Sequence, residues 1–296
     1  DAAFGDQYTQ QFNLNIQQQF SSDWFVQVGY VGKVSHKLPV VNEYNFARFG
    51  PGATAANVDA RRPYYPQYYA GIGINHADAN SNYHSLQLEA RKRLSNSFSM
   101  QLAYTWSKSI DEGSNDNAEG STTSNPYNYL KGERGLSAFH RGSVLAVSGV
   151  YDLPGFGSAS LAARMFGGWR LSGTLQVSSG APFSVITGRD TALLGASRAL
   201  GSQRAEQVGV ATLDTSRPRA ELIQKYFNTA AFVSPAIGAF GSSGRNILIG
   251  PGSVNANMAV LKDFRLSARE NLGKIQLRAE AYNLTNVVNL GPHQLP

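Results

Sequence analysis

The segment YHSLQLEARKRLSNSFSMQLAYTWSKS, residues 83–109, decides the fold class of the chain. Apolar and polar side chains alternate within it over residues 83–94 and again over 97–109, with only Ser95 and Asn96 in between. Such alternation is typical of a β-strand with one apolar face, and a two-residue break between two such strands indicates a hairpin. The segment therefore predicts two long antiparallel strands joined by a tight turn.

The same period of two recurs along the rest of the chain and predicts six further strands. They cover residues 7–20, 24–34, 142–153, 168–179, 254–266 and 274–286. The stretch 142–153 is apolar on both faces, so the sequence leaves its register open. The expected fold is all-β, a meander of hairpins that follow one another along the chain.

The connections between these strands alternate in length. Short ones cover 21–23, 95–96, 154–167 and 267–273, and long ones cover 35–82, 110–141 and 180–253. All 12 prolines fall in connections or at the chain end, as strands paired on both sides require. Strands of a soluble sandwich are usually shorter, and its long loops have no reason to gather at one end. Long strands with short turns on one side and long loops on the other predict an antiparallel outer-membrane β-barrel.

The composition excludes several other classes of protein. The 296-residue chain is 16% charged and 11% aromatic, which is too aromatic for a disordered chain and too uncharged for a solvated helical bundle. No apolar run exceeds about four residues, so no membrane-spanning helix is expected. The mean hydropathy of -0.27 still permits a membrane β-barrel, because only every second side chain of a barrel strand faces the lipid. No cysteine is present, and the net charge of +6 forms no basic stripe, so neither a disulfide scaffold nor a nucleic-acid partner is expected.

The aromatic residues support the barrel interpretation. Trp24 and Trp169 begin strands after short connections, whereas Trp106 ends a strand before a long one. Four more rings lie near the short connections, at Phe20, Phe98, Tyr151 and Phe264. This placement predicts two aromatic belts at the membrane interfaces. The alternative is that bulky rings simply fill a β core.

Several segments together resemble a known family. They are GYVGKVSHKLP (29–39), NSNYHSLQLEARKRLSNSFSMQLAYTWSKSIDE (80–112), GGWRLSGTLQVSSGAPF (167–183), YFNTAAF (226–232), GRNILIGPG (244–252) and LRAEAYNLTN (277–286). The chain is similar to the C-terminal part of the barrel of a TonB-dependent outer-membrane transporter. The Oar-like subfamily, whose members carry a carboxypeptidase-regulatory-like domain, is the most similar.

The resemblance implies a larger protein than this chain. Family members have a barrel of roughly 22 strands, an N-terminal plug and a TonB box that couples uptake to the inner-membrane proton gradient. The final residues GPHQLP (291–296) also depart from the closing strand of the family. We therefore expect residues 1–296 to be a single segment of such a barrel, with the plug and the closing strand absent. We expect it to form a curved open sheet.

The long connection 35–82 is the candidate ligand-binding loop. It is rich in aromatic and basic side chains, among them Arg61, Arg62, Tyr64, Tyr65, Tyr68 and Tyr69. Such rings can stack on sugars or grip a peptide, and binding residues concentrate on loops held by rigid scaffolds. The alternative is that tyrosine and proline merely stiffen a surface loop.

A second candidate set lies on the polar faces of the strands, which would face the lumen of a barrel. It comprises Glu89, Arg91, Arg93, Arg170, Arg278 and Glu280. These side chains could contact a solute or the plug. They could equally form a ladder of charge pairs between neighbouring strands that lines water.

No catalytic or metal-binding pattern stands out. The sequence has neither HExxH nor GxSxG, and the five histidines fall in predicted loops or at strand ends. Asp111, Glu112, Asp116 and Glu119 lack the spacing of a calcium loop and predict a solvated acidic loop. We therefore expect no enzymatic activity, no metal and no cofactor.

The resulting hypothesis is an outer-membrane transport component of a Gram-negative bacterium that takes up a large polar solute. Its expected partners are outer-membrane lipid and lipopolysaccharide, and the TonB complex through the absent N-terminal part. The alternative is a structural or adhesive outer-membrane surface protein, because long aromatic loops can also serve cell contact. Transport rests on the family resemblance.

Overall fold

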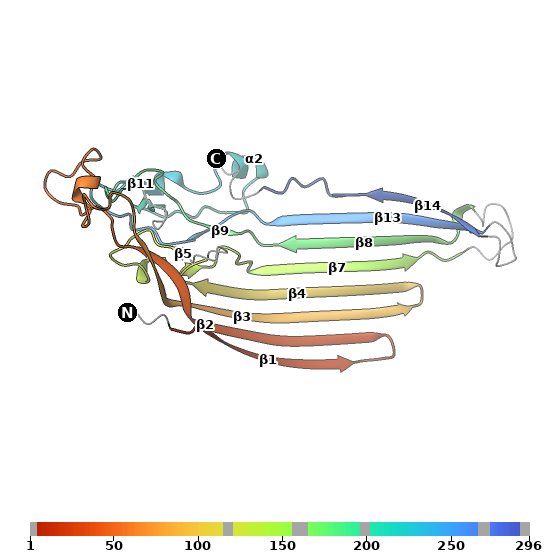
Figure 1. The fold of residues 1–296 in the computed structure, drawn as a ribbon. Helices are drawn as coiled ribbons and strands as arrows, with labels where there is room; N and C mark the ends of the chain where they lie inside the picture. The colour runs from red at the N-terminus through yellow and green to blue at the C-terminus, as the bar shows by residue number, and fades with distance from the viewer. Residues whose placement is uncertain (1–4, 115–120, 156–164, 196–201, 266–272, 291–296) are drawn as a thin grey trace.

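The computed structural model describes residues 5–114, 121–155, 165–195, 202–265 and 273–290. Its main feature is an antiparallel sheet whose long strands follow one another in chain order (Figure 1). The long strands are β1 (Tyr8–Gln19), β2 (Trp24–Glu43), β3 (Gly73–Ser95), β4 (Phe98–Asp111), β7 (Ser143–Asp152), β8 (Trp169–Ser178), β13 (Ser253–Arg265) and β14 (Lys274–Ala281). All the expected strands and their meander order are confirmed.

Two strands are longer than the sequence indicated. β2 continues to Glu43 and β3 begins at Gly73, so much of the expected loop 35–82 is strand, and the true loop is 44–72. Pro39 therefore lies inside β2, contrary to expectation. The β2–β3 register shifts between Ser35 and Pro39, and Lys37 has a φ of 57°. A bulge at this point allows β2 to continue through Pro39, which has no N–H to donate to the neighbouring strand.

The two ends of the sheet differ as expected (Figure 1). At one end, β1 and β2 are joined by residues 20–23, and β3 and β4 by Asn96 and Ser97, whose φ values of 47° and 65° fit a two-residue hairpin turn. At the other end lie the loops 44–72, 112–142 and 179–252. The predicted connections 154–167 and 267–273 lie largely outside the described residues, as do both chain termini.

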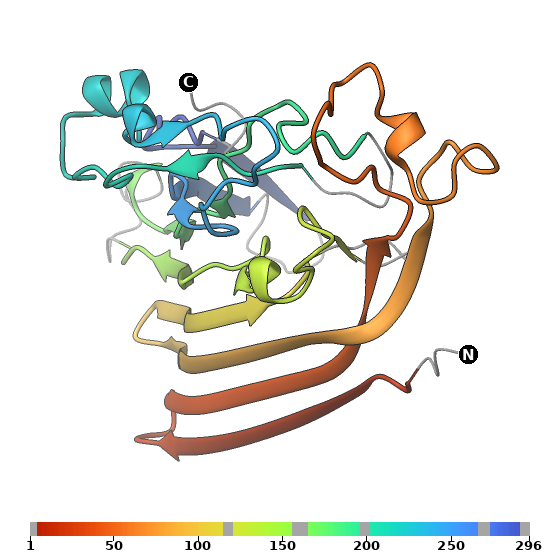
Figure 2. The ribbon, with the colours of Figure 1, turned by 90° about the vertical axis from the view of Figure 1, so that its left-hand side faces the viewer.

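The sheet is curved and open among the described strands (Figure 2). Its strand order runs from β1 to β14, and each of these two strands has one long neighbour. The expectation of an open sheet rather than a small closed barrel is confirmed. No helix in the described ranges is long and apolar enough to cross a membrane.

Register sorts the side chains of the sheet into two faces. Val28, Leu88 and Tyr104 occupy one transverse row of the convex, apolar face, and Gln27, Glu89 and Ala103 the adjoining row of the opposite face. The register of β7 is also settled, because Leu145 pairs with Tyr104 and with Val177. The apolar side chains stay exposed, Leu14 at 66% and Ile16 at 67%. A contiguous apolar surface of this kind requires a non-aqueous neighbour.

Much of the buried apolar material lies in the loops. Phe46, Ala192 and Leu194 form one small core against Phe240. A second core joins Ala211, Ala231 and Leu248 to rings that include Phe183 and Phe227. Short elements organise the same region, namely β5 (Ser121–Thr122), β6 (Gly135–Leu136), β9 (Pro182–Phe183), β10 (Glu206–Gln207), β11 (Phe232–Val233), β12 (Leu248–Ile249) and α2 (Arg219–Gln224). The loops therefore form a packed layer over one end of the sheet, here called the loop layer.

Candidate functional site: the concave face and the loop layer

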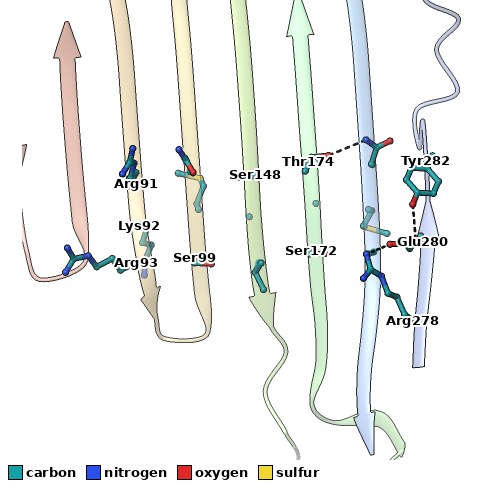
Figure 3. A pocket seen from close by; sticks show the side chains of 18 residues that line it. Arg91, Lys92, Arg93, Ser99, Ser148, Ser172, Thr174, Arg278, Glu280 and Tyr282 are labelled. Carbon is teal, nitrogen blue, oxygen red and sulfur yellow. Dashed lines mark hydrogen bonds and ion pairs between the residues drawn. The ribbon is translucent and has the colours of Figure 1, made fainter. Parts of the chain in front are cut away.

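The polar face of the sheet carries a broad hollow (Figure 3). Its volume is about 640 Å³, and it is lined from β3, β4, β7, β8, β13 and β14. Arg91, Arg93, Arg278 and Glu280 border it, together with hydroxyl and amide side chains such as Thr174 and Asn257. The period of two places these side chains on one face, because successive residues of a strand point to opposite sides.

The charged residues of the hollow are partly paired. Arg91 forms an ion pair with Glu89, which also accepts a hydrogen bond from Gln101 at 3.4 Å. On the far side Arg278 pairs with Glu280, whose other oxygen accepts a hydrogen bond from the Tyr282 hydroxyl at 2.9 Å (Figure 3). These two ion pairs run along single strands rather than across them. The alternative given by the sequence, a ladder of charge pairs between neighbouring strands, therefore does not apply to these two ion pairs.

Two of the candidate residues differ from this arrangement. Arg170 on β8 donates to both carboxylate oxygens of Asp152 on β7, at 2.5 and 3.3 Å, and so forms a pair between neighbouring strands. Arg93 borders the broad hollow and a smaller one of about 270 Å³ next to Trp24. Its guanidinium has no ion pair with another described residue. The concave face thus offers both free and paired charges to a polar solute.

The candidate loop residues separate into two groups. Tyr64, Tyr65, Tyr68 and Tyr69 remain 47–71% exposed in the loop 44–72. Arg62 is buried, where it pairs with Asp59 at 3.0 Å and donates to the Asn45 carbonyl at 2.6 Å. Arg61 donates to the carbonyls of Arg48 and Leu193 at 2.5 and 2.9 Å. The arginines therefore hold the loop together, whereas the tyrosines face outward.

Two arginines of the loop 179–252 fix this loop in place, Arg204 to the loop 112–142 and Arg245 to the end of β4. Arg204 pairs with Glu133 at 2.9 Å, and Glu133 also accepts from the Ser124 hydroxyl at 2.6 Å. Arg245 pairs with Asp111 and donates to its backbone carbonyl at 2.6 Å. All four charged side chains are nearly buried. These contacts make the loop layer a rigid scaffold.

The sequence predicted a solvated acidic loop at 110–141, and this prediction is wrong for Asp111 and Glu112. Asp111 is buried against Arg245, and Glu112 accepts from the backbone and side chain of Asn80 at 2.8 and 3.0 Å. Asp116 and Glu119 lie outside the described residues. The reason is tertiary, because Arg245 lies 134 residues from Asp111 in the sequence. No local spacing signals that pair.

Burial shifts the pKa values of three titratable groups of the loop layer. Burial raises the pKa of Tyr129 to about 12, reinforced by its 2.6 Å hydrogen bond to Asp78. Burial also raises the pKa of Tyr226. Burial lowers the pKa of His140, with help from the nearby charges of Arg141 and Lys108. His140 Nδ1 accepts the Ser109 N–H at 3.3 Å, so a neutral ring fits this position.

The described residues contain no group of three His, Cys, Asp or Glu that could hold a metal ion. Three histidines that the sequence assigned to loops or strand ends lie within strands, His36 in β2 and His76 and His84 in β3, because these strands extend further than expected. They pack mainly with rings and amides: His84 Nδ1 lies 2.7 Å from the Tyr30 hydroxyl, and His36 bonds to Asn80 at 2.8 Å. His36 and His84 are therefore engaged in hydrogen bonds within the sheet.

Among solved structures the chain is similar to the outer membrane transporter YddB from Escherichia coli, with 11% identity and a TM-score of 0.49 over 96% of this chain. The chain spans only 29% of the length of that transporter. No curated protein matches the chain. The family described as "Outer membrane beta barrel domain" matches residues 1–294. The protein therefore belongs to the outer membrane β-barrel domain family and resides in the outer membrane of a Gram-negative bacterium.

Proposed function

We propose that this chain forms part of the barrel wall of a TonB-dependent outer-membrane transporter similar to the Oar-like subfamily. This transporter would take up a large polar solute. A saccharide, a peptide or a chelate would suit its chemistry. The observation that carries the proposal is the position of exposed tyrosines on a rigid loop layer at the end of a charged concave face. Capture outside and passage along the lumen would then be adjacent.

In this proposal the tyrosines of the loop 44–72 make first contact with the solute. Tyr64, Tyr65, Tyr68 and Tyr69 present ring faces that stack on sugar or peptide groups. Arg61 and Arg62 position the loop, since their donors are engaged by loop oxygens. Because the loop is ordered before the solute arrives, little conformational entropy is lost on binding.

In the lumen, Arg93 and the paired charges of the hollow offer successive polar contacts to the solute or to the plug. Glu89, Arg91, Arg278 and Glu280 can exchange partners with a passing solute, because exposed ion pairs are worth little. Coupling to the proton gradient would come through the plug and the TonB complex. These parts belong to the family and not to the described residues.

The test is uptake by cells that carry a variant with all four tyrosines replaced by serine. We expect weaker binding by roughly 2 to 6 kcal/mol, at about 0.5 to 1.5 kcal/mol per ring, with normal amounts of folded protein. The matched control replaces the same tyrosines by phenylalanine, which keeps the rings. A panel of oligosaccharides, peptides and ferric chelates would serve as solutes.

A proton uncoupler distinguishes TonB-dependent transport from the alternative, a structural or adhesive surface protein. Transport predicts that uptake by the unmodified protein stops when the gradient collapses. Uptake that ignores the uncoupler would contradict the TonB-dependent function. Loss of cell attachment in the serine variant, with no effect on uptake, would favour the adhesive function instead.

A further inference from the structure

A row of basic side chains crosses the apolar face of the sheet at its loop end. His84 on β3 pairs in register with Lys108 on β4. The last β4–β7 pair is Trp106 with Ser143, and the Ser107 N–H donates to the Gly142 carbonyl at 2.9 Å. The β4–β7 ladder ends at this pair, and the bond keeps the next residues of the chain beside β4. The Ser107 hydroxyl donates to the Arg141 carbonyl at 2.9 Å, and the charges of Lys108 and Arg141 both act on His140, so Arg141 lies beside the end of this row.

This row lies just beyond the apolar band. On β4 the band runs from Phe98 to Trp106, a distance of eight residue steps, or about 26 Å at 3.3 Å per step. The lipid-facing band of an outer-membrane barrel is about 25 Å tall, and aromatic rings mark its edges. Trp106 is 62% exposed and marks the edge beside the loops. Lys108 and Arg141 therefore lie at the depth of the lipid headgroups.

The charges of this row lack counterions. The Lys108 ammonium is exposed and makes no hydrogen bond or ion pair with another described residue. Arg141 donates to the His140 carbonyl at 2.8 Å and has no carboxylate partner in the described ranges. Burial of His140 excludes it as a third exposed contact. The Lys108 ammonium thus faces the lipid, and the partly exposed Arg141 guanidinium near it has most of its donors unused.

Lysines at the opposite end of the same face are arranged differently. Lys92 lies between the rings of Trp24 and Phe98 and donates to the Ser95 hydroxyl at 2.6 Å. Lys262 lies between the rings of Trp169 and Phe264 and donates to a backbone carbonyl. These ammonium groups are already satisfied by the protein. Among the described side chains of this face, the unsatisfied cations lie at the loop end.

We propose that Lys108 and Arg141 bind a phosphate group of the phosphorylated glycolipid in the outer leaflet. Loops of outer-membrane barrels are extracellular, so this end of the face meets that leaflet. Two neighbouring cations suit a phosphate through charge-assisted hydrogen bonds. Trp106 would contact the lipid beneath the phosphate, and His84, held by the Tyr30 hydroxyl, borders the site.

The test is native mass spectrometry of the protein purified from outer membranes, in detergent with a chelator that removes bridging divalent cations. The probes are diphosphorylated lipid A, dephosphorylated lipid A and phosphatidylglycerol. We expect the diphosphorylated lipid to bind best, and the variant K108Q/R141Q to bind it about 30-fold more weakly, at about 1 kcal/mol per cation. Equal binding of the dephosphorylated lipid, or of phosphatidylglycerol, would overturn the proposal.

Two further variants serve as controls. Lys33 lies at nearly the same height on β2 but on the opposite face, and its ammonium also has no partner among described residues, so K33Q should leave lipid binding unchanged. K108R/R141K keeps both charges and should bind within about threefold of the unmodified protein. A loss in K33Q as large as in K108Q/R141Q would show a general charge effect and refute a local site.

Discussion

Arg204 donates to Glu133 across 2.9 Å, and the side chains of both residues are nearly buried although 71 positions separate them in the sequence. Glu133 also accepts from the backbone and hydroxyl of Ser124. Arg204 donates further to the Gly132 carbonyl at 2.7 Å. One ion pair thus fastens the loop 179–252 to the loop 112–142.

Neutralising one partner should release these loops from each other. In E133Q the guanidinium of Arg204 stays buried without its counter-charge, a change that costs about 3 to 5 kcal/mol for buried pairs. We expect faster hydrogen exchange in residues 121–142 and 202–252, with the strands unchanged, because the loops have their own small cores. The control E221Q alters an exposed carboxylate in α2. Unchanged exchange in E133Q would contradict this account.

A second prediction concerns Gly180, where the loop 179–252 leaves the sheet. A methyl group at Gly180 would overlap the carbonyl of Gly250, at the point where the Gly250 N–H donates to the Ala181 carbonyl at 2.8 Å. Backbone cannot move aside as a side chain can, so G180A should destabilise the loop base by about 1 to 3 kcal/mol. Limited proteolysis of this loop would report the effect. G50A is the matched control, since a methyl group there meets nothing within 4 Å.

The strands could be predicted from the sequence because their information is local. Alternation with a period of two fixes which face of β3 or β4 is apolar, and the break at Asn96 fixes the turn. The bulge before Pro39 could not be predicted, because the alternation lapses there while the strand continues. A proline in an irregular stretch is more typical of a loop.

The candidate site was predictable only in part, for a related reason. Parity along a strand assigned Arg91 and Arg278 to one face, which the structure also places around one hollow. The roles of Arg62 and Arg245 depend on partners in folded loops, Asn45 for one and Asp111 for the other. Composition alone cannot tell an arginine that binds a ligand from one that binds a carbonyl.

A third prediction concerns the pH dependence of the contact between His140 and Ser109. The pKa of His140 lies below its ordinary value of 6.5, so the folded protein binds this proton less readily than the unfolded chain. The stabilisation from the neutral ring is therefore present above about pH 6.5 and lost as the pH falls below it. We expect a smaller protection factor for the Ser109 amide at pH 5 than at pH 8, after each exchange rate is corrected for the base-catalysed intrinsic rate at that pH, because only the neutral Nδ1 can accept its hydrogen.

Removing a nearby charge should move the same titration. Lys108 contributes to lowering the pKa of His140, so K108Q should raise that pKa towards 6.5 while burial keeps it below. An NMR titration of the labelled imidazole would measure the shift. K33Q, which removes a charge from the opposite face, should leave the pKa of His140 unchanged. A fall of the pKa in K108Q would contradict the assigned cause.

The last prediction concerns orientation in the membrane. The chain contains no cysteine, so a single introduced thiol reports its own position. Tyr68 lies exposed in the loop 44–72, and Ser22 lies exposed in the turn between β1 and β2, at the opposite end of the sheet. Because barrel loops are extracellular and short turns periplasmic, Y68C should react with an impermeant maleimide on intact cells, and S22C only after the outer membrane is opened. Labelling of S22C on intact cells, with Y68C protected, would show the opposite orientation. It would then also contradict the proposed contact between Lys108 and the outer leaflet.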